Sequence, residues 1–337
     1  MTGAAMVCFE EASKSWLKWA QARKRKPMRV TSVPTIKSAL SKWIIPHVGA
    51  LPLDKVHNGT CKPLVKAMQD AELSSRTQNM YLGIVKQVVA SVTDDETGEP
   101  IVVRKWNPAA MDLPVIEHQK TPCFTSEQLE KILAPLPERG WERTLYVLLA
   151  SSGLRISEAL ALDRIEVVEE LERVLDSREG VPWTMTLTVN KQVSRYGKIV
   201  QYTKTKAGVR QVDLHSSVTR VLTKYVGMGQ EGRKRGNKGE LLFPTRRGTA
   251  QLPRNLLRVL KKRTSHGFHS FRRFRNTVLS EQNCNRDAEV YWMGHSPHSM
   301  SELYSKLAKK TDFRLAEAER IGVGFDPTVK QIVKSQK

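Results

Sequence analysis

The sequence has few cysteines, no cysteine pair and no long apolar run. Four cysteines stand singly among 337 residues, and no Cys-x-x-Cys spacing occurs. This scarcity argues against a zinc ribbon or a disulfide framework and is typical of the reducing cytoplasm. No stretch approaches the roughly 18 consecutive apolar residues of a membrane-spanning helix, and the first residues lack the basic stretch of a signal peptide. We therefore expect a cytoplasmic protein without membrane association.

Acidic residues are scarce relative to basic ones. The chain has 55 lysines and arginines against 34 aspartates and glutamates, so its formal net charge is +21 and its pI is near 9.9. A net charge with a magnitude of roughly 2–8 is enough to keep a small domain soluble. Because the excess here is much larger, it favours a polyanionic partner, and nucleic acid is the commonest one.

The length suggests two domains at ~150 residues each. A segment with three prolines, residues 107–125, has no sustained apolar period and is interpreted as a linker. We place a first domain at residues 1–112, the linker at 113–123 and a second domain at 124–337.

Apolar residues at helical spacing occupy most of the first domain. Residues 9–26, 34–48 and 73–92 each show a period near 3.6, and Ser74 or Ser75 can cap the last of these segments. The pattern predicts a compact bundle of about four helices.

The second domain also begins with helices. Thr125 and Gln128 fit a capping box at the start of one helix. A buried helix is expected over 141–152 and should stop at Gly153. After Pro253 the pattern is helical almost to the end of the chain.

Between these helical parts the apolar period changes to two. Residues 182–193, 198–205 and 208–214 alternate in this way, with turn residues between them. The pattern predicts a three-stranded antiparallel sheet. The predicted fold class is therefore α+β, mainly α with one small antiparallel sheet.

Seven polar residues of the second domain stand out by their order along the chain. Singly, each has an ordinary structural explanation. An ion pair across one helical turn accounts for Arg155 and Glu158, and a lysine on a hairpin tip is usually solvated, with Lys206 a rival for Lys204. In chain order the seven are Arg155, Glu158, Lys204, His269, Arg272, His295 and Tyr304.

In this order the seven residues resemble the tyrosine recombinases, the phage-integrase family. SGLRISEAL at 152–160 is similar to the family's first arginine box, and TKTKAGVR at 203–210 is similar to its lysine hairpin. HSFR resembles the H-x-L-R box, with Phe271 where leucine is commoner. MGHSPHSMSELY resembles the L-G-H…Y segment, with Met293 in the leucine position. Both departures exchange one apolar residue for another.

The resemblance implies a C-shaped clamp of a helical core-binding domain and a catalytic domain on double-stranded DNA. It implies an enzyme that cuts and rejoins DNA through a covalent 3′-phosphotyrosine and a Holliday junction. No metal, ATP or other cofactor is implied. A homotetramer on two inverted-repeat core sites is expected, with a tail at about 305–337 as the subunit contact. The implied location is the nucleoid of a bacterial or phage-infected cell.

The resemblance assigns the proton transfers to three residues. Tyr304 is the implied nucleophile, and a phenol with an ordinary pKa of ~10 needs a partner to lose its proton. His269 is the implied acceptor of that proton. Lys204 is the implied general acid, which protonates the departing 5′-oxygen.

The other four residues are implied to hold the phosphate. Arg155 and Arg272 supply guanidinium forks, whose geometry matches phosphate oxygens. His295 is implied to hydrogen-bond a non-bridging oxygen, and Glu158 to orient Arg155 or His269. The arginines would then supply the charge that Mg²⁺ supplies in other enzymes.

Basic runs and one helix start are the expected DNA contacts. Basic side chains bind phosphates, and polar residues at a helix start can read bases in the major groove. A solvated charged face remains the alternative for each run. The expected phosphate contacts are Arg23, Lys24, Arg25, Lys26, Arg233, Lys234, Arg235, Arg246 and Arg247, and the expected base-reading residues are Arg76, Gln78 and Asn79.

Three alternatives stay open. A type IB topoisomerase has a similar site but relaxes supercoils as a monomer. A DNA-binding regulator with a degenerate catalytic domain would need no chemistry, although here all the chemical positions are filled. A zinc site fits no standard spacing, and its ligands would come from His266, His269, Cys284, His295 and His298.

Overall fold

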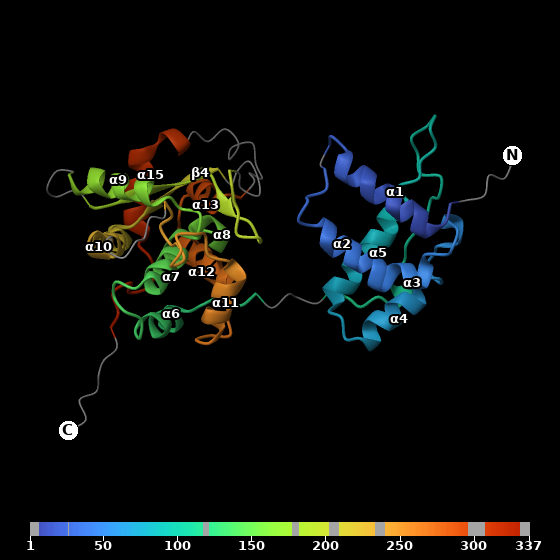
Figure 1. Ribbon diagram of the computed structural model, residues 1–337, viewed down its shortest axis with the longest axis horizontal. Helices are drawn as coiled ribbons and strands as arrows, with labels where there is room; N and C mark the ends of the chain where they lie inside the picture. Colours follow the sequence, from blue (N-terminus) through green and yellow to red (C-terminus); the bar gives the residue numbers. More distant parts are fainter. Residues whose placement is uncertain are drawn as a thin grey trace, which may run out of the picture. The chain divides into compact units, whose positions relative to one another are not determined.

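The computed structural model describes residues 7–25, 27–116, 121–176, 182–201, 209–232, 240–295 and 307–330. The chain divides into two compact units, Met1–Lys120 and Thr121–Lys337, each with its own hydrophobic core (Figure 1). The boundary falls inside the segment that the sequence predicts as the linker. Several residues singled out from the sequence lie outside the described residues: Lys26, Lys204, Lys206, Arg233, Lys234, Arg235, His298 and Tyr304.

The first unit is a helical bundle, as the sequence predicts. Its helices bury their apolar faces in one core that contains Phe9, Ile44, Leu64 and Leu82. Short turns of other helical types lie at Leu40–Ile44, Leu53–Lys55 and Ala109–Met111. The α-helices are α1 (Phe9–Ala22), α2 (Val33–Ala39), α3 (Ile45–Val48), α4 (Lys62–Asp70) and α5 (Ser75–Val89).

Helix α5 anchors the chain that leaves the first unit. The Ser74 hydroxyl accepts a hydrogen bond from the Thr77 amide and caps the helix. In the next turn Asn79 Nδ2 donates to the carbonyl of Pro114 at 2.9 Å. Leu113 is buried in the core of the first unit. The first two residues of the predicted linker, 113 and 114, therefore pack on the first unit.

The second unit is built around helix α7 (Trp141–Ser152). This helix is buried from Arg143 to Ser152 and packs against α10 (Ser216–Gly232) and α12 (Phe268–Glu281) (Figure 1). None of the described helices combines the length and apolarity needed to cross a membrane. The other helices are α6 (Ser126–Leu133), α8 (Ile156–Ala159), α9 (Arg164–Leu175), α11 (Pro253–Lys261), α13 (Arg286–Met293) and α15 (Thr311–Ile321), with a 3-10 turn at Leu307–Lys309.

Within the part of the chain that the structure describes, the strands form two short antiparallel ladders and not the predicted three-stranded sheet. Strand β1 (Met185–Val189) pairs with β4 (Arg210–Leu214), and β2 (Gln192–Val193) pairs with β3 (Ile199–Val200). The segment predicted as the first strand is interrupted at residues 190–191, and its halves have different partners.

The interruption coincides with a contact to α9. Lys191 Nζ lies 3.3 Å from the Asp163 carboxylate at the start of that helix, so the backbone there is tied to α9. The described strands therefore form two two-stranded ladders where one three-stranded sheet is predicted. The fold class, mainly α with small antiparallel β-structure, is confirmed.

The C-terminal segment packs on its own domain. Ala318, Ile321, Val323 and Phe325 are all buried in the core of the second unit. Phe313 on α15 stays 43% exposed. Of the described tail, residues 311–325 thus complete their own domain. The expectation of a subunit contact at about 305–337 stays a prediction, with the 43% exposed Phe313 as the described apolar side chain most available for it.

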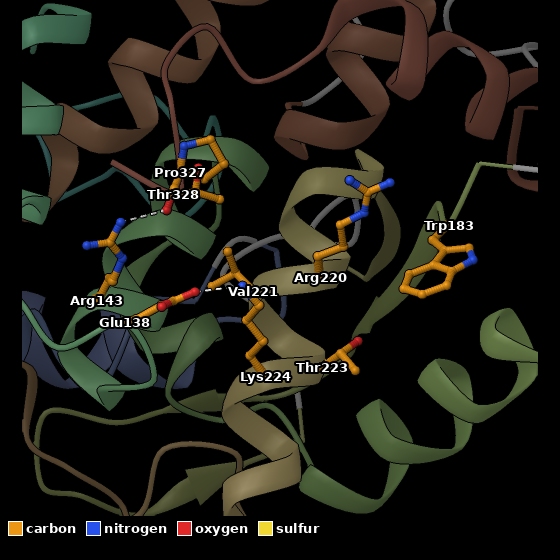
Figure 2. Close-up of a pocket in the computed structure, with 9 residues that line it drawn as sticks. All are labelled: Glu138, Arg143, Trp183, Arg220, Val221, Thr223, Lys224, Pro327 and Thr328. Carbon is orange, nitrogen blue, oxygen red and sulfur yellow. Dashed lines mark hydrogen bonds and ion pairs between the residues drawn. The ribbon is translucent and has the colours of Figure 1, made fainter. Parts of the chain in front are cut away.

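A buried arginine holds the end of the described chain. Arg143 is 2% exposed, and its guanidinium donates to the carbonyls of Leu133 (2.8 Å) and Val329 (2.6 Å). It also donates to the carbonyl of Pro327 at 3.0 Å (Figure 2). Beside it, a surface cavity of about 360 Å³ is bridged by the ion pair between Lys224 and Glu138, 2.6 Å apart. The C-terminal segment is thereby fastened to α7.

Candidate active site

The site begins at the glycine that ends α7. Gly153 adopts a left-handed conformation with φ of +67°, and a Cβ there would lie 2.7 Å from the Met293 sulfur. Glycine is therefore needed both for the turn and for the close approach. Two residues later Arg155 is the N-cap of α8.

Arg155 and Glu158 form a closed pair across the first turn of α8. The Arg155 amide donates to Glu158 Oε2 at 3.0 Å, and its guanidinium donates to Oε1 at 2.7 Å. The Glu158 side chain is 1% exposed, whereas that of Arg155 is 25% exposed. Glu158 thus orients Arg155, one of the two roles that the resemblance implies for it, and leaves the arginine accessible at the surface.

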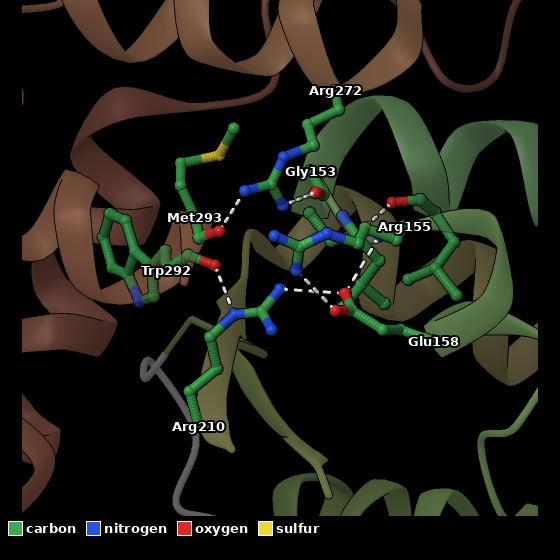
Figure 3. A network of polar contacts seen from close by, with 10 residues as sticks. Gly153, Arg155, Glu158, Arg210, Arg272, Trp292 and Met293 are labelled. Carbon is green, nitrogen blue, oxygen red and sulfur yellow. Dashed lines mark hydrogen bonds and ion pairs between the residues drawn. The ribbon is translucent and has the colours of Figure 1, made fainter. Parts of the chain in front are cut away.

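A second arginine, Arg210 on β4, completes the environment of Glu158. Its guanidinium donates to Glu158 Oε2 at 3.1 Å and to the carbonyl of Trp292 at 2.7 Å, and its side chain is fully buried (Figure 3). Burial has the largest influence on the Glu158 carboxyl and alone would raise its pKa. The charges of Arg210 and Arg155 outweigh burial and hold that pKa below its ordinary value.

Arg210 is a site residue that the motifs in the sequence do not single out. A signal exists, because Arg210 shares the period-two register of Val212 and Leu214, which are buried apolar residues. An arginine on the buried face of a strand needs partners for its charge. The alternation therefore marks Arg210 as an unusual residue, although it does not reveal which carboxylate the arginine meets.

Arg272 on α12 lies on the other side of the cluster. Its guanidinium donates to the carbonyl of Gly153 at 2.7 Å and also to that of Met293 (Figure 3). It is 4% exposed. Burial, followed by the charges of Arg155 and Arg210, lowers the pKa of Arg272 to about 9. The cations are thus close enough to oppose one another's charge.

Two histidines and Arg272 line one cavity of about 350 Å³. His269 lies one turn before Arg272 on α12, and His295 follows Gly294, whose φ of +58° ends α13. Burial first, and then the charges of Arg272 and Arg155, lower the pKa of His295 below its ordinary value. At neutral pH this imidazole is therefore uncharged, with one N–H to donate.

The arginine cluster has an excess of positive charge. We define it as Arg155, Arg210, Arg272 and Glu158, which together carry three positive charges and one negative charge. Like charges this close repel one another, and a bound anion would offset that repulsion. The cluster and the neighbouring cavity are therefore suited to bind an anion with several oxygens.

Metal binding finds no support in the part of the chain that the structure describes. No group of three histidine, cysteine, aspartate or glutamate side chains is placed there to hold an ion. Of the residues named for a zinc site, His266 instead contacts the Cys123 carbonyl through Nε2 at 3.2 Å and stacks on Phe124.

The basic residues expected to contact phosphates are exposed wherever they are described. Arg23, Lys24 and Arg25 follow α1 at the surface, and Arg23 lies over the ring of Trp19, 5.1 Å from its centroid. A second exposed group is Arg246 and Arg247.

The expected base-reading helix is only partly suited to that task. Arg76 is exposed at the start of α5. Gln78 is 4% exposed, and its Nε2 donates to the Leu73 carbonyl at 2.7 Å. Asn79 Nδ2 donates to two backbone carbonyls. Gln78 is therefore too buried to read a base as the side chain stands, whereas Asn79 is partly exposed and its role in base reading stays a prediction.

The chain was compared with known proteins by sequence and by fold. The Phage integrase family model matches residues 122–311. No curated protein matches the chain by sequence.

Two solved structures with similar folds are both DNA complexes. The Tn1549 transposon integrase in complex with transposon right end DNA is 19% identical, with a TM-score of 0.63 over 93% of this chain and 99% of that chain. The lambda integrase dimer bound to a COC′ core site is 13% identical, with a TM-score of 0.53 over 88% of this chain and 95% of that chain. At these identities the likeness concerns the fold. Since the family match covers more than half of the sequence, the chain belongs to the phage integrase family, the tyrosine site-specific recombinases.

Proposed function

We propose that this chain cuts and rejoins duplex DNA at specific sites through a covalent 3′-phosphotyrosine and a Holliday-junction intermediate. The observation that carries the proposal is the arginine cluster, with three guanidinium groups and one carboxylate beside a cavity lined by two histidines. A phosphodiester supplies the negative charge that the cluster needs.

The cluster is preorganised for a phosphate before DNA arrives. Glu158 fixes Arg155, and the carbonyls of Gly153 and Met293 fix Arg272. Attack on phosphorus increases the negative charge on the non-bridging oxygens. Groups that are already oriented toward that charge stabilise the transition state without reorganisation, and each such group typically contributes ~10²–10³ in rate.

In the proposed reaction Tyr304 supplies the nucleophile. Its phenol oxygen forms a bond to phosphorus while the bond from phosphorus to the 5′-oxygen breaks. His269 accepts the phenol proton, and Lys204 donates a proton to the leaving 5′-oxygen. The strand is left with a 3′-phosphotyrosine and a free 5′-hydroxyl.

Religation reverses these steps with a 5′-hydroxyl from the other duplex. The phosphotyrosine conserves the bond energy, so the exchange needs no ATP. His295, which is neutral at pH 7, is suited to donate its N–H to a non-bridging oxygen. The arginines provide the positive charge at the phosphate.

We propose duplex DNA with an inverted-repeat core site as the substrate. Arg23, Lys24 and Arg25 of the first unit and Arg246 and Arg247 of the second are proposed phosphate contacts, with Lys26 and residues 233–235 added from the sequence. The net charge of +21 supports this assignment. Four chains on two sites supply one tyrosine for each of four strand cleavages, and the charge opposes their association until DNA neutralises it.

A suicide substrate tests the proposal. On a half-site duplex nicked beside the scissile phosphate, the unmodified chain should accumulate a covalent protein–DNA adduct, and Tyr304→Phe should bind the DNA without forming it. A regulator with a degenerate site would form no adduct in either case. Relaxation of supercoiled DNA that lacks any recombination site would indicate a type IB topoisomerase instead.

A further inference from the structure

Arg314, on the first turn of α15, is a buried arginine outside the arginine cluster whose three guanidinium nitrogens all donate hydrogen bonds. Its side chain is fully buried, and its Nε donates to Asp213 Oδ2 at 2.8 Å. One terminal nitrogen donates to the carbonyls of Leu307 (2.5 Å) and Ala308 (3.0 Å), and the other donates to Gln211 Oε1 at 2.9 Å. Arg314 therefore fixes the backbone at residues 307 and 308 to strand β4.

Asp213 is held just as firmly. Its Oδ1 accepts the hydroxyl of Thr186 on β1 at 2.6 Å, and its Oδ2 also accepts Nε1 of Trp292 at 2.7 Å. The Asp213 side chain is fully buried. Strand β1, helix α13 and the start of α15 thus share one carboxylate.

Trp292 connects the pair of Arg314 and Asp213 to the arginine cluster. The backbone carbonyl of Trp292 accepts Nε of Arg210, whose guanidinium holds Glu158 (Figure 3). A continuous chain of charge-assisted hydrogen bonds therefore runs from Glu158 to Arg314 and ends at the carbonyls of Leu307 and Ala308. Such bonds are the stronger ones in proteins, and inside a low-dielectric core they define geometry well.

The end of this network lies close in sequence to the proposed nucleophile. Leu307 is three residues after Tyr304. Three extended residues span at most about 11 Å. Whatever fixes Leu307 therefore limits where the Tyr304 backbone can be relative to the arginine cluster.

We propose that Arg314 is a positioning residue for strand cleavage, which sets the distance between the Tyr304 backbone and the arginine cluster. The proposal rests on the proposed function of Tyr304. Arg314 acts through the carbonyls of Leu307 and Ala308. Since misplacement of a reacting group by about 1 Å costs up to ~10²-fold in rate, a weakened anchor slows cleavage without weakening DNA binding.

Arg314→Lys tests the proposal because it keeps the charge but loses the planar fork. Arg143→Lys is the matched control: Arg143 is also buried and also bonds backbone carbonyls, but those of Leu133, Pro327 and Val329. Three quantities are measured for each variant: the melting temperature, the affinity for a half-site, and the single-turnover rate of adduct formation at saturating DNA.

Arg314→Lys should slow adduct formation at least ~10-fold and leave half-site affinity within about two-fold. Arg143→Lys should lower the melting temperature but keep the rate per bound molecule within about two-fold of the unmodified chain. The proposal is overturned if Arg314→Lys cleaves at the unmodified rate. It is also overturned if Arg143→Lys, at an equal loss of melting temperature, slows cleavage as much.

A milder variant covers the case in which Arg314→Lys does not fold. Gln211→Ala removes one acceptor of Arg314 and leaves the ion pair with Asp213. It should slow adduct formation by about three-fold or more, without loss of affinity, and an unchanged rate would overturn the proposal. If the unmodified chain forms no adduct, the proposed function fails, and that failure is distinguishable because it appears before any Arg314 variant is made.

Discussion

Arg155→Lys separates the charge of the arginine cluster from its geometry. Lysine keeps the positive charge but has no planar fork, so it cannot hold two phosphate oxygens at once or reproduce the 2.7 Å contact to Glu158 in the same orientation. Losing one preorganised donor to the transition state typically costs ~10²–10³ in rate, or about 2.7–4 kcal/mol. We expect strand cleavage to fall by at least ~10²-fold.

The stability of the fold should change much less. Glu158 keeps its contacts to Arg210 and to the Arg155 backbone amide, and the Arg155 side chain is 25% exposed. With the charge retained and solvent nearby, we expect a loss of about 1 kcal/mol in the free energy of unfolding. Half-site binding should remain near the unmodified value, because one phosphate contact among many is changed.

The assay is single-turnover adduct formation on the nicked half-site, with affinity and unfolding measured on the same preparations. Arg173→Lys is the control, since Arg173 also pairs with a glutamate three residues away at 2.7 Å but is 61% exposed. It should leave all three quantities unchanged. Cleavage by Arg155→Lys within a few-fold of the unmodified rate would refute the reasoning. Arg155 would then have only a structural role, as the N-cap of α8.

Three further outcomes are expected. Lys204→Ala should cleave ordinary DNA slowly. A substrate with a bridging 5′-phosphorothiolate should largely restore its cleavage rate, because the thiolate leaves without a proton. If this substrate instead restores cleavage by Lys206→Ala, Lys206 is the general acid. The folded-state pKa of His295 lies below its ordinary value of 6.5, so the unfolded chain binds more protons between the two values and stability rises with pH through that window. The DNA-free protein should therefore lose stability as pH falls below 6.5. Denaturant titrations at several pH values give the free energy of unfolding, which should change less with pH in His295→Gln than in the unmodified chain. An equal change with pH in the two proteins would contradict this. Truncation after Lys310 removes Arg314 and leaves Asp213 as an unpaired buried carboxylate, which alone should cost about 3–5 kcal/mol of unfolding free energy. The loss of the buried apolar residues of α15 adds to this cost. A truncated chain with an unchanged melting temperature would contradict the packing of α15 described above.

Local signals in the sequence were sufficient for the elements that carry the site. A capping box predicts the start of α6, and the structure has it at Thr125 and Gln128. Gly153 predicts the end of α7, and its left-handed conformation places Arg155 at the start of α8. These predictions succeed because a few neighbouring residues determine each feature.

Contacts between distant residues could not be predicted in this way. Arg314 and Asp213 are 101 residues apart in the chain, and the sequence around either residue does not indicate that the two form an ion pair. The interruption of the first strand likewise coincides with a contact between distant residues, Lys191 and Asp163. Period and composition specify which face is apolar, but they do not specify which buried charges meet.

The position of Gln78 in the sequence already indicates that its side chain is buried. It lies four residues before Leu82 and seven before Val85, on the stripe that α5 buries. We assigned it to the DNA because glutamine is polar. Its position on the helix, rather than its chemistry, decides that it faces the core.

The central claim is that Tyr304 becomes linked to the 3′-phosphate of the cut strand. The most direct test is to trap the adduct on a nicked half-site, trim the DNA with nuclease and locate the remaining phosphonucleotide by peptide fragmentation. The account predicts the mass on Tyr304, attached through a 3′-phosphate, and no adduct from Tyr304→Phe. Attachment to another residue, such as Tyr291, or through a 5′-phosphate would contradict it.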